Sequence, residues 1–355
     1  MRMRLTTLPR IVVTLTATML VAVTGATSAG GATKAPTPAA PQAVTAIPPH
    51  LYAPYFEVWT PDSVSTIASR SGVRYLTLAF LQTSKAGSCM PDWNGEANEP
   101  FTGGRYLSQI KMLRAAGGDV IPSFGGYSAD VTGTELAESC PEIKRIVADY
   151  ENLVTLYGVS RLDFDIEAKS LTNTLGINRR DRAITELEAW ATANDYPLQV
   201  SFTMPASAAG LVGSGLKVLR NAIMNHTRVD IVNIMAFDYY DGTTKMGAAA
   251  ISAAQALHTQ LAQLYPAKSS AELYAMEGIT LMPGIDDNPN KAEVTSLGNT
   301  RRVAAWAESH GIDTLSIWAI QRDNGRCPGV NGSNSCSGIS QRRWAFSHIL
   351  EPFTS

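Results

Sequence analysis

Short apolar runs alternate with longer amphipathic stretches along most of this chain, and this alternation limits the folds open to it. Apolar runs of strand length occur at 51–57, 73–81, 119–124, 161–167, 198–204, 230–237, 278–282 and 314–320. Helical patterns fall between or after them, for example at 106–116, 142–157, 179–194, 216–225, 248–265, 300–310 and 341–349. Eight strands, each followed by a helix, predict an α/β protein: a (β/α)8 or TIM barrel in a single domain over residues 49–355. A doubly wound sheet is the alternative, but it would normally carry a glycine-rich phosphate turn after its first strand, which this sequence lacks.

The first residues have the composition of an export signal. Arg2, Arg4 and Arg10 flank an apolar run over 11–26, and small residues suited to signal peptidase follow it. We therefore expect a signal peptide at 1–32, a Pro/Ala-rich linker at 33–48 and a secreted, extracellular protein. A retained N-terminal anchor is the alternative, although the run is short and rich in Thr and Ala for a membrane span.

Removal of the leader makes the protein mildly acidic. Residues 1–46 contain four basic and no acidic residues, so their loss moves the formal charge from −2 to −6. Nucleic-acid-binding domains normally carry a basic surface. We therefore expect no nucleic-acid partner, no membrane partner after cleavage of the signal, and a monomer.

The four cysteines all lie in the expected mature protein. An even number of cysteines in an exported chain suggests disulfides. Cys327 and Cys336 bound a short Gly/Asn/Ser loop, which favours their pairing, and Cys89–Cys140 follows by elimination. A zinc site is the alternative, but neither a CxxC spacing nor a nearby histidine supports it.

The run 161–167 alternates apolar and acidic residues with the period of a strand that has two unlike faces. Asp163, Asp165 and Glu167 share one face. Three carboxylates in a row repel one another and are costly to bury, so stability alone does not account for them. At about 3.3 Å per residue they form a column with Glu167 uppermost, at the end of a barrel strand where active sites lie.

Such a column suits glycoside hydrolysis of one kind. Ionised neighbours and burial raise the pKa of the terminal acid, which makes it a usable general acid near neutral pH. Two acids on one strand approach a sugar from the same side, so neither can be the nucleophile across the ring. A 2-acetamido oxygen of the substrate can attack instead, which points to N-acetylhexosamines. The alternatives are an acid cluster paired with arginine and a hard-cation site.

Residues 162–167 resemble the catalytic signature of glycoside hydrolase family 18, the chitinases and endo-β-N-acetylglucosaminidases. That signature reads Asp-Gly-x-Asp-x-Asp-x-Glu on the fourth strand of a (β/α)8 barrel, and its last three acids match Asp163, Asp165 and Glu167. Its leading Asp-Gly is replaced here by Ser160-Arg161, which marks a divergent branch.

Other stretches resemble further motifs of the same family, so that the likeness spans about residues 50–350. The sequence 123–126 is similar to the Ser-x-Gly-Gly motif, whose glycines Gly125 and Gly126 would let the chain turn beside the acids. Residues 235–238 resemble the Met-x-Tyr-Asp motif, with Met235 and Asp238 in place. Trp318 matches the tryptophan beneath the −1 sugar, and 201–206 and 281–284 resemble the fifth and seventh strands.

The resemblance implies a role for each of these residues. Glu167 would protonate the glycosidic oxygen and then act as base, Asp165 would orient the acetamido group, and Asp163 would hold Asp165 and share a proton with it. Asp238 would add negative charge, and Trp318 would stack on the sugar. The family tyrosine that donates to the acetamido group is Phe237 here, so Tyr239 or Tyr240 would have to supply the hydroxyl, or Asp165 and Asp238 would hold the group alone.

The expected function is therefore that of a retaining hydrolase of β-1,4-linked N-acetylglucosamine, most simply chitin, by substrate-assisted catalysis. An endo-β-N-acetylglucosaminidase acting on the core of N-glycans is the nearest alternative. A non-catalytic chitin-binding lectin on the same fold is the alternative from another class, and the presence of Glu167 favours an enzyme.

The sequence leaves open whether several further residues contact the substrate. Glu57 and Trp59, near the end of the first strand, are candidates to line the cleft. Asp286 and Asp287 are more typical of a solvated turn than of a sugar contact, and Asp92 and Trp93 are candidates for a subsite. The five histidines are scattered in the sequence, so we expect neither a metal nor a cofactor.

Overall fold

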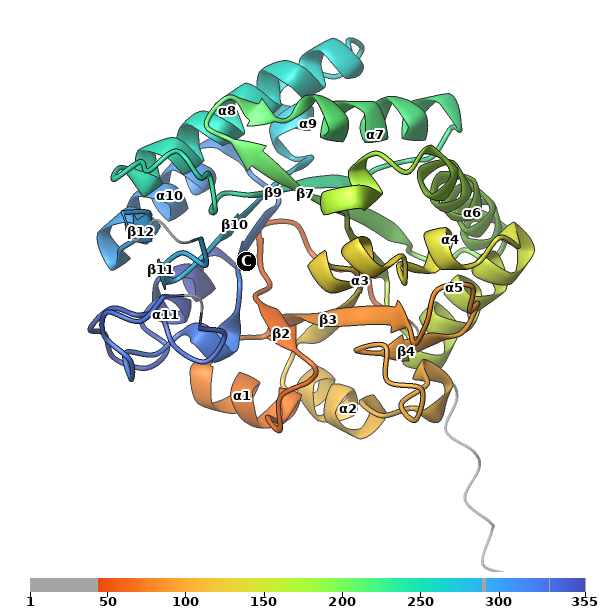
Figure 1. Ribbon diagram of the computed structural model, residues 1–355, viewed down its shortest axis with the longest axis horizontal. Coiled ribbons are helices and arrows are strands. Elements are labelled where there is room, and N and C mark those ends of the chain that lie inside the picture. Colours follow the sequence, from red (N-terminus) through yellow and green to blue (C-terminus); the bar gives the residue numbers. More distant parts are fainter. Residues whose placement is uncertain (1–43, 289–291, 332, 355) are drawn as a thin grey trace, which may run out of the picture. The chain divides into compact units, whose positions relative to one another are not determined.

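A ring of parallel strands surrounded by helices forms the described part of the protein (Figure 1). The computed structural model describes residues 44–288, 292–331 and 333–354. The strands follow the order β1-β13-β10-β9-β7-β6-β5-β3-β2, and each neighbouring pair in this order is parallel. Their bounds are β1 (Leu51–Tyr52), β2 (Tyr55–Glu57), β3 (Tyr75–Thr83), β5 (Asp119–Gly125), β6 (Arg161–Asp165), β7 (Gln199–Ser207), β9 (Ile231–Met235), β10 (Glu277–Leu281) and β13 (Thr314–Ile317).

The barrel closes through the first predicted strand, which is broken in two. β1 pairs with β13 and β2 pairs with β3, and only Ala53 and Pro54 separate them. Proline has no N–H to give to a sheet, so the break falls where ladder bonding is weakest. The carbonyl of Pro54 still accepts the Thr77 N–H, and the Ala53 N–H reaches Leu315, so the two halves act as one barrel strand. All eight strands expected from the sequence are confirmed, and with them the (β/α)8 fold.

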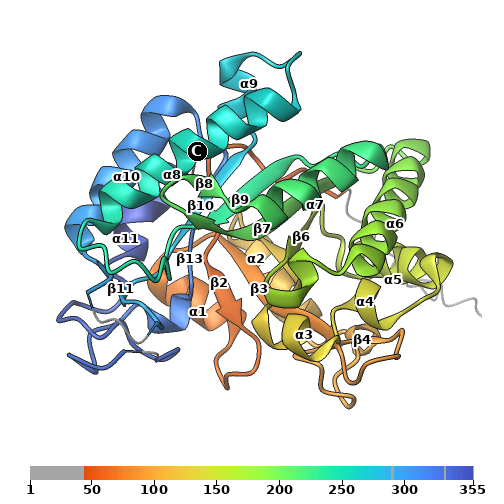
Figure 2. The same ribbon diagram turned by 45° about the horizontal axis from the view of Figure 1, so that its top comes forward.

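Helices cover the outside of the ring (Figures 1 and 2). The helix α5 shows why these segments are helical: its buried residues recur at the spacing of one helical face, and Gly158 ends it in the left-handed conformation. The helix bounds are α1 (Val64–Ser71), α2 (Leu107–Ala115), α3 (Tyr127–Thr132), α4 (Leu136–Ser139), α5 (Ile143–Tyr157), α6 (Thr174–Ala193), α7 (Gly213–Met224), α8 (Met246–Leu264), α9 (Ser270–Tyr274), α10 (Leu297–His310) and α11 (Ser347–Leu350).

The two faces of β6 enter different layers. Phe164 points outward and packs with Phe124 and Phe202 of the neighbouring strands, at ring-centroid distances of 5.5 and 5.9 Å, and with Tyr150 of α5 at 5.4 Å. The acidic face points into the barrel. The apolar layer between sheet and helices therefore carries the packing energy, and the barrel interior is left to polar groups.

Two expectations of local structure need correction. The strand β6 ends at Asp165, so Glu167 lies beyond it, in extended backbone that leads into the short 3-10 helix Ala168–Leu171. The helix expected at 341–349 is confined to α11, because Trp344 adopts a left-handed conformation with φ 65°. The buried Asp323 accepts the N–H groups of Phe346 and Ser347 and so fixes where this helix begins.

Several short elements were not expected. β4 (Pro91–Trp93) pairs antiparallel with β3, β8 (Gly210–Leu211) with β7, and β11 (Gly284–Ile285) with β12 (Val294–Thr295). They are two or three residues long, too short for a periodic pattern to be visible in the sequence.

Both expected disulfides are present, Cys89–Cys140 and Cys327–Cys336, so these sulfur atoms are not metal ligands. None of the described helices has both the length and the hydropathy of a membrane span. The expected signal peptide and most of the expected linker lie outside the described residues.

Candidate active site

A cavity of about 810 Å³ opens at the carboxyl ends of the barrel strands. This volume lies in the range of about 300–1,000 Å³ that is typical of small-molecule sites. Carboxyl groups, aromatic rings and a few amides and hydroxyls line it. The lining includes Asp165, Glu167, Asp238, Asp287, Tyr55, Trp59, Phe80, Tyr127, Phe237, Tyr240, Trp318, Gln82, Asn94 and Asn334.

Asp163, the lowest of the three acids, lies beneath the cavity and is surrounded by hydroxyl groups. Its Oδ2 accepts hydrogen bonds from Tyr55 at 3.0 Å and Ser123 at 2.7 Å. Its Oδ1 accepts from Ser201 at 2.5 Å and Thr203 at 2.8 Å. Burial raises the pKa of Asp163 and these hydroxyls oppose the rise, because they stabilise the ionised form. Four donors on two oxygens satisfy a carboxylate and leave no position for a proton.

Asp165, the middle acid, has an environment of the opposite kind. It is buried, and its Oδ1 has no hydrogen-bond partner among the described residues. Burial raises its pKa well above the ordinary value, and the nearby charges of Glu167, Asp163 and Asp130 raise it further. A buried carboxyl oxygen without a hydrogen-bond partner is costly, so in a cavity wall it is expected to bind a proton or to accept a hydrogen bond from a ligand.

Glu167 is the uppermost and most accessible of the three acids. Burial, with a smaller contribution from the charge of Asp238, raises its pKa to about 7, although the backbone N–H of Tyr127 acts in the other direction. Its own backbone N–H donates to Oδ2 of Asp130, a buried residue of α3. A carboxyl group that is still protonated near neutral pH can act as a general acid.

The two glycines of the segment 123–126 let the chain turn directly beside Asp165. Both have positive φ, 97° at Gly125 and 85° at Gly126. A Cβ at Gly125 would lie 2.2 Å from the carbonyl oxygen of Asp165, and one at Gly126 would lie 2.5 Å from the ring of Phe80. Any other residue would therefore displace either β6 or the cavity wall.

Aromatic side chains form a platform on one wall. Trp318 stacks on Phe80, with ring centroids 5.5 Å apart and planes 15° apart, and contacts Tyr55 and Trp59 at 5.6 and 6.1 Å. Tyr127 and Tyr240 are exposed and line the cavity as well. Flat aromatic faces with carboxyl groups nearby suit a ring-shaped ligand that is apolar on its faces and polar at its edge.

The structure separates the two tyrosines considered as replacements for the hydroxyl that Phe237 lacks. Phe237 and Met235 line the cavity. Tyr240 lines it too, whereas Tyr239 packs against the hydrophobic core and its hydroxyl has no hydrogen-bond partner among the described residues. Tyr240 is therefore the member of the pair whose hydroxyl can reach a ligand.

A buried glutamate organises the loop that carries Asp238. Glu293 accepts the backbone N–H groups of Tyr239, Asp241 and Gly242, and the amide of Asn288. Asp286, also fully buried, accepts the N–H of Asp238 itself. Asp238 has φ 49°, and burial raises its pKa to about 6. The charge of Asp287 is the second largest contribution to this rise. These acids fix the backbone that presents Asp238.

Glu57 is not where the sequence suggested. Its side chain is fully buried and does not line the cavity, and burial raises its pKa to about 8. The backbone of Glu57 forms two hydrogen bonds with the amide of Gln321, and this turns the end of β2 toward the neighbouring 3-10 helix Ile320–Arg322. Trp59 does line the cavity, whereas Asp92, Trp93 and Asp286 are buried away from it.

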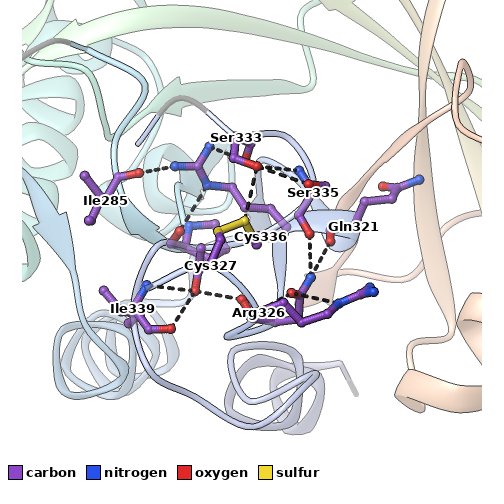
Figure 3. The surroundings of a disulfide bond; sticks show 12 residues. Ile285, Gln321, Arg326, Cys327, Ser333, Ser335, Cys336 and Ile339 are labelled. Atoms are coloured by element: carbon purple, nitrogen blue, oxygen red, sulfur yellow. Dashed lines mark hydrogen bonds between the residues drawn. A yellow bond between two sulfur atoms is a disulfide. The ribbon is translucent and has the colours of Figure 1, made fainter. Parts of the chain in front are cut away.

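Arg322 joins two loops at the cavity edge. Figure 3 shows the disulfide that closes one of them, with Ser333 and Ile285 nearby. It is buried, pairs with Asp287 at 2.5 Å, and donates to the carbonyls of Ile285, Pro283 and Ser333. Ser333 lies in the loop closed by Cys327–Cys336, next to Asn334. The arginine and the disulfide together hold Asp287 and Asn334 at the cavity wall.

Sequence reasoning missed the residues that act from beneath the surface. Ser201 and Thr203 alternate with apolar neighbours, so the period-two pattern used for 161–167 would have found them. Asp130 and Arg322 lie in short helices and Glu293 lies in a loop, and no spacing in the sequence distinguishes these charged residues. Across the described residues, no group of three or more His, Cys, Asp or Glu side chains is arranged to hold a metal ion.

Comparisons with known proteins point in one direction. The family model described as glycosyl hydrolases family 18 matches residues 52–293. A probable bifunctional chitinase/lysozyme of Escherichia coli is 34% identical over 322 residues, which cover 86% of this chain and 35% of that protein. Endochitinase 11 of Metarhizium anisopliae is 32% identical over 287 residues, 78% of this chain and 53% of that protein.

Among solved structures, the catalytic domain of a hyperthermophilic chitinase from Pyrococcus furiosus is similar with a TM-score of 0.76 and 30% identity. The match covers 88% of this chain and 97% of that one. The chain thus spans about a third and about half of the two curated relatives, and nearly the whole of a solved catalytic domain.

Proposed function

Since this chain belongs to glycosyl hydrolase family 18, we propose that it is a secreted, retaining hydrolase of β-1,4-linked N-acetylglucosamine, with chitin or chito-oligosaccharides as substrate. The observation that carries the proposal is the contrast among three acids of β6 and the segment that follows it. Asp163 is satisfied by four hydroxyls, Asp165 is buried with a free oxygen, and Glu167 has a pKa of about 7. Neighbouring acids in such different environments take different roles.

In the proposed mechanism Glu167 gives its proton to the glycosidic oxygen. The acetamido oxygen of the −1 sugar attacks the anomeric carbon from the opposite face as the leaving group departs, and a positively charged cyclic intermediate forms. Asp165 accepts a hydrogen bond from the acetamido N–H through the oxygen that has no partner among the described residues, and its carboxylate balances the positive charge of the intermediate. Glu167, now ionised, takes a proton from water as it opens the ring, so the anomeric configuration is retained.

In this mechanism the four hydroxyl groups around Asp163 keep it ionised, and its charge acts on Asp165. A fixed negative charge one position below Asp165 raises the pKa of Asp165, as Glu167 does from above. A bound acetamido N–H and the positive charge that develops on the substrate oppose this rise and favour the ionised form of Asp165. Trp318 and Phe80 supply the face on which the sugar ring stacks.

The choice among N-acetylated substrates rests on charge. Asp165, Glu167, Asp238 and Asp287 all line the cavity. Of these, Asp238, with a pKa of about 6, would be ionised at neutral pH and would repel the carboxylates that peptidoglycan carries on its lactyl groups and stem peptides, so peptidoglycan is expected to be a poor substrate although one relative is named as a chitinase/lysozyme. Neutral chito-oligosaccharides meet no such repulsion. Cleavage of N-glycan cores remains the nearest alternative, since it would use the same acids.

The proposal is tested by product analysis on four substrates in parallel: chitohexaose, a high-mannose glycoprotein, peptidoglycan, and cellohexaose as the matched sugar without an amide. We expect fragments of chitohexaose with retained configuration by NMR, and none from cellohexaose. Glu167→Gln should lower turnover at least about 10²-fold while retaining binding, and Glu188→Gln, a buried glutamate of α6 outside the cavity, should not. Equal cleavage of cellohexaose, or full turnover by Glu167→Gln, would refute the proposal. Binding of chitohexaose without any product would identify a lectin instead.

A further inference from the structure

The helix α3, which follows directly on β5, holds Glu167 at two points. The backbone N–H of Tyr127, its first residue, faces the Glu167 carboxyl group and favours its ionised form. One turn later, Oδ2 of Asp130 accepts the backbone N–H of Glu167. The same short helix therefore contacts both the reactive end and the main chain of the terminal acid.

The main-chain contact is needed because Glu167 lies past the end of its strand. The last sheet-like bond of this segment runs from the Ile166 N–H to the carbonyl of Thr203. Beyond it the chain leaves the sheet for the 3-10 helix at 168–171. The N–H of Glu167 thus has the Asp130 carboxyl group as its partner in place of a neighbouring strand.

The ionisable groups that act on Asp130 are other carboxyl groups, which oppose its ionisation. It is fully buried, and its Oδ1 has no hydrogen-bond partner among the described residues. The charged groups that act on it are Glu135 from the segment before α4 and Glu167 from the end of β6, and Asp130 in turn acts on Asp165. Lys169 of the facing 3-10 helix directs its ammonium group to the carbonyl of Val131 instead.

We propose that Asp130 is a positioning residue for Glu167, and that it performs this role as a neutral carboxylic acid. The inference rests on the proposed function, because it assigns a purpose to a residue behind the proposed acid. Asp130 does not line the cavity, so it acts through Glu167 and does not touch the substrate.

A further observation supports a neutral Asp130. Burial, together with the charges of Glu135 and Glu167, raises its pKa to about 9, although the Glu167 N–H and the nearby Ser170 hydroxyl favour ionisation. An unpaired charge at this buried position would be far more costly than a neutral acid.

The two parts of the proposal are tested with Asp130→Asn and Asp130→Ala. Asparagine is neutral, of the same size, and keeps an oxygen for the Glu167 N–H, so we expect kcat within about threefold of wild type and an unmoved alkaline limb of the pH profile. Alanine removes the acceptor, and a displaced acid should lower kcat about 10²-fold with little change in KM. Asp149→Ala is the matched control, since Asp149 is a buried acid of α5 whose Oδ2 has no hydrogen-bond partner among the described residues and lies 3.7 Å from the guanidinium group of Arg145.

Amide hydrogen exchange at Glu167 gives a readout that does not depend on the substrate. Exchange should accelerate in Asp130→Ala and stay slow in Asp130→Asn and Asp149→Ala. Wild-type kcat or unchanged Glu167 exchange in Asp130→Ala would overturn the positioning role. A shift of the alkaline limb to lower pH in Asp130→Asn would show that a negative charge had been removed, and would overturn the neutral state. If wild type cleaved no chito-oligosaccharide but the exchange pattern held, the proposed function would fail and the contact would stand.

Discussion

Replacement of Ser201 by alanine tests whether Asp163, which four hydroxyl groups surround, carries a negative charge. The Ser201 hydroxyl donates to Oδ1 of Asp163 at 2.5 Å, the shortest of the four hydroxyl contacts to this carboxyl group. Ser201 does not line the main cavity, so the substitution leaves the substrate surface intact. Ser316→Ala is the matched control, because Ser316 is also buried inside the barrel but donates to a neutral carbonyl, that of Ala53, at 2.8 Å.

The two substitutions should differ in cost according to the charge of the acceptor. A hydrogen bond to a charged group contributes about 1.5–3 kcal/mol, and one to a neutral group about 0.5–1.5 kcal/mol. Asp163 is buried, so no solvent screening reduces the first figure. At pH 7 we therefore expect Ser201→Ala to lower the free energy of unfolding by about 1 kcal/mol more than Ser316→Ala does.

The difference should depend on pH in one direction. Burial raises the pKa of Asp163 in the folded state, so the folded protein binds this proton more tightly than the unfolded chain does. The stability that protonation of Asp163 contributes is therefore complete at low pH, and it is lost as the pH rises through the folded pKa. Loss of a donor raises that pKa further. The extra cost of Ser201→Ala should thus be greatest at neutral pH and shrink toward that of Ser316→Ala as Asp163 becomes protonated.

Urea unfolding followed by tryptophan fluorescence, at a series of pH values from 7 downward, measures both free energies. Equal losses for Ser201→Ala and Ser316→Ala at pH 7 would mean that Asp163 is already neutral there. The argument that four hydroxyls stabilise a fixed negative charge below Asp165 would then be wrong.

Three further predictions concern the cavity and its loops. Because only protonated Glu167 can donate a proton, kcat/KM should fall above about pH 7. Asp238→Asn should move this alkaline limb to lower pH, because it removes a charge that raises the pKa of Glu167, and an unmoved limb would contradict this. Tyr240→Phe should lower kcat about 10²-fold if its hydroxyl replaces the one missing from Phe237, and the added change Phe237→Tyr should restore it, whereas full activity of Tyr240→Phe would exclude that role. Replacement of both cysteines by serine should cost more stability for Cys89–Cys140, which spans 51 residues, than for Cys327–Cys336, which spans 9: about 4 against about 2.5 kcal/mol in thermal or urea unfolding. Only loss of Cys327–Cys336 should raise KM, because its loop carries Asn334 of the cavity wall. A larger stability loss for Cys327–Cys336, or a raised KM on loss of Cys89–Cys140 alone, would contradict these roles.

Sequence alone determined the fold and the column of acids. Period-two alternation depends only on the geometry of a strand, so the shared face of Asp163, Asp165 and Glu167 could be read without knowledge of any neighbour. The order of strands and helices likewise left few topologies, and the two disulfides followed from four cysteines in which one pair is local.

Tertiary structure decided what each acid does. The donors to Asp163 come from β2, β5 and β7, and Tyr55 and Thr203, which meet there, are 148 residues apart in sequence. No local pattern records that convergence, because it depends on barrel closure. Glu57 shows the converse: its position at a strand end predicted a cavity residue, and the turn of the chain toward Gln321 buried it. A residue's type and spacing fix which face it shares, but its pKa depends on burial and on neighbours that only the folded chain brings together.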